Sequence, residues 1–124
     1  MRSPKNQSVI IGIVGPCSSG KSTLITGLKR RGIQARHIAQ EHSYVQDMWR
    51  QITNPRILIY LDVSYEISMR RRKLDMTREE FQHEIELLSH ARQSADLYIK
   101  TDDISITQVL DRVLAFLEER GIPG

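Results

Sequence analysis

Apolar positions along the chain fall into uninterrupted runs and into stretches with helical spacing, and the two kinds alternate. The segments Val9–Val14 and Ile57–Val63 are apolar runs rich in β-branched residues, which is typical of strands buried on both faces. Ile33–Ala39 and Leu97–Thr101 are shorter candidates of the same kind. The pattern therefore predicts four strands.

Helical periodicity fills the intervals between these strands. Candidate helices span residues 21–31, 43–52, 64–74, 77–95 and 105–120. In the second of them, one face would carry Tyr44, Val45, Met48, Trp49 and Ile52. The fourth and fifth open with the capping-box patterns Thr77-x-x-Glu80 and Ser105-x-x-Gln108, which predict their first turns.

The order of these elements predicts the fold class. Strands that alternate with helices form a parallel sheet with helices on both faces. We therefore expect a three-layer αβα sandwich around four or five parallel strands. Residues 9–124 should form one domain, and the polar residues 1–8 a flexible N-terminus.

Composition narrows the class of protein. The chain has 124 residues and a formal net charge of +3, which suits an anionic ligand but is too small to indicate nucleic-acid binding. One cysteine, Cys17, excludes an internal disulfide. Neither a signal peptide nor a membrane span is visible, so we expect a cytoplasmic protein without a membrane partner.

The stretch Gly15–Ser22, GPCSSGKS, matches the pattern G-x-x-x-x-G-K-[ST] and lies between a predicted strand and a predicted helix. Glycines let backbone N–H groups turn towards phosphate oxygens, and the helix N-terminus favours the same anion. Lys21 would bridge the outer phosphates and Ser22 would bind Mg²⁺. The predicted nucleotide-binding residues are Gly15, Pro16, Cys17, Ser18, Ser19, Gly20, Lys21, Ser22 and Thr23.

A carboxylate at the end of a neighbouring strand would complete the magnesium site. Asp62 ends the segment ILIYLD, and Glu41 follows the segment ARHIAQ. Asp62 could instead anchor the next helix, and Glu41 could be a solvated loop acid. The residues alone leave both candidates open.

Three segments resemble the small-molecule and nucleoside-monophosphate kinase branch of P-loop NTPases, which includes shikimate and adenylylsulfate kinases. They are GPCSSGKSTLITGLKRRG, ILIYLDVSYEISMRRR and ADLYIKTDDISITQVLDRVLAFL. The resemblance implies a P-loop NTPase fold, Mg²⁺ with ATP, and a lid whose arginines, with Lys21, act in catalysis. The candidates for the lid are Arg70, Arg71 and Arg72, which could equally be a solvated helix end.

The chain departs from that family in its middle. Only Ala39–Arg56 separates the second strand from ILIYLD, where the family has acceptor-binding helices and a further strand. If a strand is missing, ARHIAQE would lie beside the first strand, and this favours Glu41 over Asp62 for magnesium.

Two functions follow from the resemblance. The first is a small kinase that transfers the γ-phosphoryl group of Mg·ATP to an unknown small-molecule or nucleotide acceptor. The alternative is a nucleotide-binding module or slow NTPase that acts through a homo-oligomer or protein partner, with Tyr44, Met48 and Trp49 as the contact patch. A GTPase-like switch is disfavoured, because Ile99 precedes Lys100 where a guanine reader has Asn or Thr.

Overall fold

The computed structural model of the chain describes residues 9–71 and 76–122. The segment 1–8, predicted to be flexible, lies outside the described residues. Arg72, one of the three predicted lid arginines, lies outside them as well.

The described residues contain one four-stranded sheet in which every neighbouring pair is parallel. Its strands are β1 (Ile11–Val14), β2 (Ala35–His37), β3 (Ile57–Asp62) and β4 (Leu97–Lys100). The order across the sheet is β2-β1-β3-β4, so β1 and β3 occupy the centre. β2 lies directly beside β1, with Ile11 opposite Ala35.

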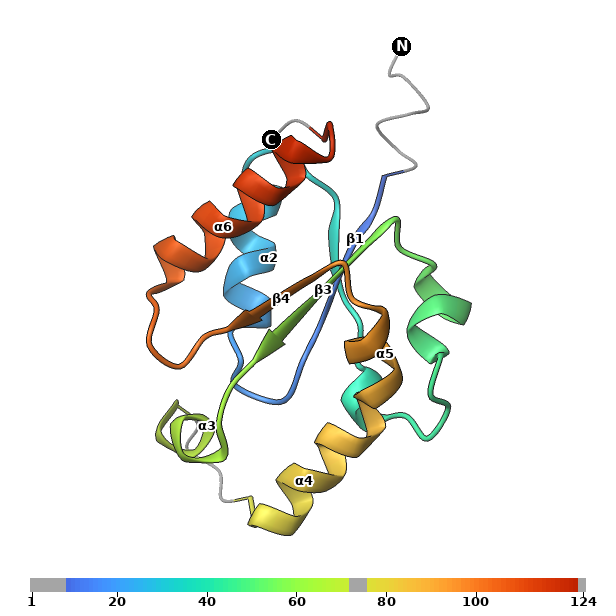
Figure 1. The fold of residues 1–124 in the computed structure, drawn as a ribbon, viewed down its shortest axis with the longest axis vertical. Helices are drawn as coiled ribbons and strands as arrows, with labels where there is room; N and C mark the ends of the chain where they lie inside the picture. Colours follow the sequence, from blue (N-terminus) through green and yellow to red (C-terminus); the bar gives the residue numbers. More distant parts are fainter. Residues whose placement is uncertain (1–8, 72–75, 123–124) are drawn as a thin grey trace.

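Helices cover both faces of this sheet, and Figure 1 shows α2 and α6 on one side of it and α4 and α5 on the other. The helices are α2 (Lys21–Lys29), α3 (Tyr65–Arg71), α4 (Arg78–Leu87), α5 (Ser89–Ser94) and α6 (Ile106–Glu119), with the 3₁₀ turn η1 (Gln40–His42) and the π-helical turn η2 (Trp49–Thr53). The predicted three-layer α/β architecture with a parallel sheet is confirmed, with four strands in the described part.

Each face of the sheet has its own apolar core. Ile13 and Ile59, both fully buried, pack with α2 and α6 through Leu28 and Val113. The opposite core is smaller and contains Val14, Ile38, Trp49, Leu58, Tyr60, Leu88 and Ala91. Both predicted capping boxes are present, at Thr77 and at Ser105, so the sequence placed the starts of α4 and α6 correctly.

The helix predicted over Ser43–Ile52 is wrong in its first half: helical structure is confined to the end of the segment, where η2 (Trp49–Thr53) forms. Gln40 is fully buried, and its side-chain amide binds two backbone groups that would pair with each other in a helix. Its Oε1 accepts from Trp49 N at 2.9 Å, and its Nε2 donates to Val45 O at 2.7 Å. Ser43 Oγ accepts from Val45 N at 3.1 Å. These local bonds hold the segment in turns, as side-chain amides and hydroxyls do when they compete with a helix.

The predicted face of that helix is consequently dispersed. Trp49 is buried at 7% exposure, but Tyr44 is 81% exposed and Ile52 73%. The long helix predicted over 77–95 also differs, because it breaks at Leu88 into α4 and α5. The break turns Ala91 into the smaller core.

Candidate functional site

The loop Gly15–Gly20 leaves the buried end of β1 and turns sharply into α2. Three of its residues have positive φ: Gly15 at 154°, Ser18 at 64° and Gly20 at 101°. A Cβ on Gly15 would lie 2.1 Å from the carbonyl oxygen of Leu61, so the loop can approach β3 this closely only with glycine. Loops of this kind can turn their N–H groups to one side and form an anion-binding concavity. Here Cys17 N already donates to Glu84 Oε1 and Ser19 N to Pro16 O, so the other N–H groups of the loop are the donors that such a concavity would use.

The N-terminus of α2 faces the same concavity. Its first intrahelical bond runs from Leu24 N to Gly20 O at 3.1 Å, so the N–H groups of residues 21–23 precede the helical ladder. These donors and the helix dipole together favour an anion.

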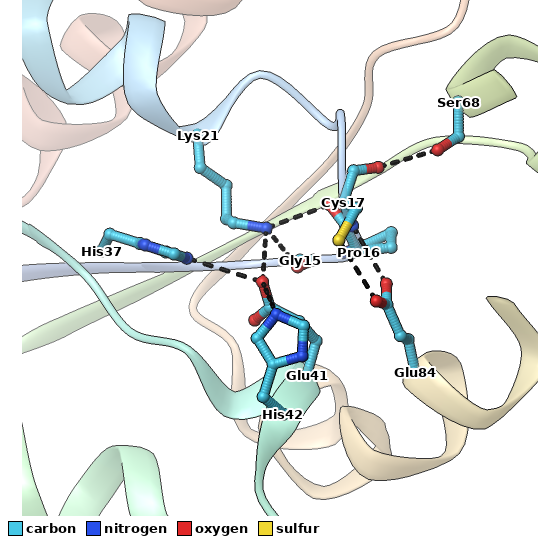
Figure 2. Close-up of polar contacts among 9 residues, drawn as sticks. All are labelled: Gly15, Pro16, Cys17, Lys21, His37, Glu41, His42, Ser68 and Glu84. Carbon is cyan, nitrogen blue, oxygen red and sulfur yellow. Dashed lines mark hydrogen bonds and ion pairs between the residues drawn. The ribbon is translucent and has the colours of Figure 1, made fainter. Parts of the chain in front are cut away.

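Lys21 reaches back from α2 across the loop and is almost buried, at 7% exposure. Its ammonium donates to Gly15 O at 2.5 Å and Pro16 O at 3.0 Å, and it pairs with Glu41 Oε2 at 3.1 Å (Figure 2). An ammonium has three donors, and these three acceptors use them all. Glu41 thus neutralises the buried charge, and an incoming anion would compete with Glu41 for it.

Glu41 lies in η1, directly after β2, and is 3% exposed. Its Oε2 also lies 3.6 Å from His37 Nε2 and 3.9 Å from His42 Nε2. Its other oxygen, Oε1, is buried and has no hydrogen-bond partner among the described residues. The site therefore contains a buried carboxylate oxygen with unused acceptor capacity.

A cavity of about 380 Å³ lies over these groups. Its lining consists of Cys17, Ser18, Ser19, Gly20, Lys21, Ser22, Thr23, His37, Glu41 and His42. A second cavity, of about 490 Å³, borders the loop between α2 and the start of α6, and its lining includes Thr23, Leu24, Thr101, Ile104 and Val109. Seven of the nine predicted nucleotide-binding residues thus line one cavity together, and the other two, Gly15 and Pro16, supply the carbonyls that Lys21 contacts.

Neighbouring elements hold the loop from outside. Glu84 of α4 accepts from Cys17 N at 3.2 Å and from Cys17 Sγ at 3.1 Å, and Ser68 of α3 donates to Cys17 O at 2.9 Å. Figure 2 shows Glu84 and Ser68 approaching Cys17 from different sides. The loop conformation is therefore supported by two helices that are distant in sequence.

Of the predicted lid arginines, Arg71 lies beside the loop. It donates to Ser18 O at 3.0 Å and to Thr101 O at 2.7 Å, and it lines the 490 Å³ cavity. Arg70 is exposed on α3. A catalytic role for Lys21, Arg70, Arg71 or Arg72 stays a prediction.

Asp62, the other candidate for magnesium, faces β4. Its Oδ1 accepts from Val63 N at 2.9 Å, and its Oδ2 accepts from the hydroxyl of Tyr98. Partial burial and this hydrogen bond raise the pKa of Tyr98 to about 12. Burial raises the pKa of the neighbouring Tyr60 still further. The structure thus brings Ser22 and Glu41 to one cavity and engages Asp62 elsewhere.

Two site residues were missed at the level of sequence. Glu84 shares the buried face of α4 with Phe81 and Leu87, so a charged residue within an apolar stripe was the available signal. Gln40 ends the strand segment and gave no comparable signal, because a single polar residue after a strand is common.

Comparisons with known proteins do not identify a family. No protein-family model matches the sequence, and no curated protein matches it. The chain is also similar to one solved structure, the orphan response regulator HP1043 of H. pylori. The similarity covers 89% of this chain and 97% of the regulator, with 19% sequence identity and a TM-score of 0.47.

The kinase assignment is therefore corrected. These comparisons give no support to the predicted P-loop kinase family or to its ATP-dependent kinase or NTPase function: the solved neighbour is a response regulator, and no family model or curated protein matches. A physical reason lies in the sheet: β2-β1-β3-β4 is also the start of the flavodoxin-like order, so a buried strand, a glycine-rich turn and a helix do not identify one family. A similarity of this size also transfers no function from the regulator to this chain.

No helix in the described part of the chain is long and apolar enough to cross a membrane.

Proposed function

We propose that the loop Gly15–Gly20 and the start of α2 bind the phosphate group of a phosphorylated ligand. The observation that carries this proposal is the position of Lys21, whose buried ammonium lies against the loop and beside a cavity lined by the first turn of α2. The proposal concerns binding and includes no phosphoryl transfer.

Charge supports the proposal. A buried ammonium is favourable only when it is compensated, and within residues 9–71 and 76–122 Glu41 is the one group that compensates it with a full charge, at 3.1 Å. A phosphate oxygen would replace one of the three acceptors of the ammonium, and other phosphate oxygens would accept from N–H groups of the loop and of α2. Such charge-assisted hydrogen bonds are about twice as strong as neutral ones.

Mg²⁺ is proposed as the companion cation, held by the Ser22 hydroxyl and Glu41. Both residues line the 380 Å³ cavity, and Glu41 Oε1 is a hard oxygen donor with no partner among the described residues. When bound, Mg²⁺ would neutralise phosphate charge. Glu41 would exchange part of its interaction with Lys21 for the cation.

The test is the change in unfolding free energy when inorganic pyrophosphate, ADP or ATP is added, each with and without Mg²⁺. A ligand present at about 100 times its Kd should stabilise the protein by about 2.7 kcal/mol. Lys21→Ala should abolish this stabilisation for all three probes, because it removes the charge at the centre of the site.

Lys29→Ala is the matched control, since Lys29 is an exposed lysine at the other end of the same helix. It should leave the response unchanged. Equal responses of the wild-type protein and the Lys21→Ala variant would reject the site, and so would a wild-type protein that responds to none of the probes.

A further inference from the structure

We propose that Cys17, Glu41 and His42 form a binding site for a transition-metal cation of the zinc class. The Cys17 sulfur, a Glu41 carboxylate oxygen and a His42 ring nitrogen all lie within 4.8 Å of one another. Thiolate, carboxylate and imidazole are the donors that Zn²⁺ takes, and three protein ligands leave its fourth position open. The proposal does not depend on phosphate binding.

The three donors come from two separate parts of the fold. Cys17 lies in the glycine-rich loop, and Glu41 and His42 lie in η1, so the contact between loop and η1 creates the cluster. The Glu41 residue is only 3% exposed, so more than nine-tenths of it is buried. Its Oε1 is buried without a partner among the described residues, which is unfavourable, so the Glu41 carboxylate has unused capacity to bind a cation.

Access and donor chemistry suit a metal from solution. The His42 side chain is 62% exposed, so its ring can turn towards an ion without disturbing the core. Sulfur and imidazole donors favour zinc-class metals, whereas Mg²⁺ prefers oxygen. The Cys17 sulfur and the His42 imidazole would therefore favour a zinc-class metal over Mg²⁺.

Two neighbouring side chains, Lys21 and Glu84, affect metal binding at the cluster. The Lys21 ammonium, 3.1 Å from Glu41 Oε2, opposes a cation and weakens its binding. The Cys17 thiol donates to Glu84 Oε2 at 3.1 Å, and it must lose its proton when the sulfur binds a metal. Metal binding therefore releases one proton for each sulfur–metal bond formed.

The test uses Co²⁺ as a spectroscopic substitute for Zn²⁺ on the reduced full chain. We expect one Co²⁺ per chain and a near-ultraviolet sulfur-to-cobalt charge-transfer band that added Zn²⁺ abolishes. Cys17→Ser should remove the band. His42→Ala should weaken Co²⁺ binding at least about tenfold, because losing even a residue that only supports a ligand weakens metal binding 10- to 100-fold. Lys21→Ala should strengthen Co²⁺ binding.

His83→Ala is the matched control, since His83 is an exposed histidine of α4 outside the cluster, and it should leave Co²⁺ affinity unchanged. The proposal is overturned if the wild-type protein shows no band, if the band survives Cys17→Ser, or if His42→Ala binds Co²⁺ as the wild type does. Because His42 is exposed, we expect the His42→Ala variant to fold as the wild type does, so its Co²⁺ affinity reports on metal binding alone. Pyrophosphate binding is measured separately on chelator-treated protein. A failure of Co²⁺ binding can therefore be distinguished from a failure of phosphate binding.

Discussion

Single residues at the carboxyl end of the sheet have clearly separated tasks. Glu41 compensates Lys21, whereas Asp62 anchors the Tyr98 hydroxyl at the far side of β3. The sequence could nominate both carboxylates but could not separate them, because each follows a strand. What separates them is the sheet order, which places β2 beside one edge of β1 and β4 beyond β3.

The Tyr98–Asp62 pair predicts a pH dependence of stability. The pKa of Tyr98 is raised from 10.0 to about 12 in the folded protein, so the folded state holds the phenol proton more tightly than the unfolded state does. This contribution is complete below pH 10 and is lost as the pH rises through about 12. Tyr98→Phe should therefore flatten the fall in unfolding free energy across this window, measured by urea denaturation at a series of pH values.

Tyr65→Phe is a control with the phenol on α3. If Tyr98→Phe and Tyr65→Phe alter the alkaline slope equally, the slope does not come from the Tyr98–Asp62 pair.

At the scale of elements, the segment between β2 and β3 depends on one buried side chain. Gln40 bonds to the backbone of Val45, Trp49 and Leu87, and the last of these bonds, at 3.4 Å, ties the segment to α4. The helical spacing of the apolar residues at 44–52 predicted a helix because periodicity records where apolar residues recur. It does not record a competing hydrogen-bond donor that becomes buried only in the folded chain.

Gln40→Ala should lower the unfolding free energy by at least about 1–3 kcal/mol, because it leaves the buried Trp49 N–H without its acceptor. Gln82→Ala, at an exposed position of α4, should change it by less than about 0.5 kcal/mol. Both are measured by urea denaturation. Similar losses in the two variants would show that the Gln40 bonds do not hold the segment.

At the scale of the whole molecule, burial in the sheet centre governs stability. Ile59 of β3 is fully buried, whereas Ile52 is 73% exposed. Ile59→Ala should lower the unfolding free energy by about 2–5 kcal/mol, and Ile52→Ala by less than about 0.5 kcal/mol. Thermal and urea unfolding of the two variants check this difference. A comparable loss for Ile52→Ala would indicate that its surface is covered in solution.

The parallel sheet and the glycine-rich loop were predictable because each depends on local signals, namely apolar runs, capping patterns and glycine spacing. The contacts of Cys17 with Glu84 and of Arg71 with Thr101 were not, since they join residues 67 and 30 positions apart. The sequence could not decide the family for a related reason: a glycine-rich turn between a buried strand and a helix occurs in more than one class of doubly wound sheet.

The described sheet ends in two short edge strands, three residues in β2 and four in β4. An open edge can recruit a strand from another chain, and this is how many β-rich proteins begin to aggregate. Here the exposed edge positions include Arg36 on one side and Lys100 on the other. Two copies meeting edge to edge would have to bring like charges together along only a few backbone hydrogen bonds, so the sheet edges themselves oppose fibril formation.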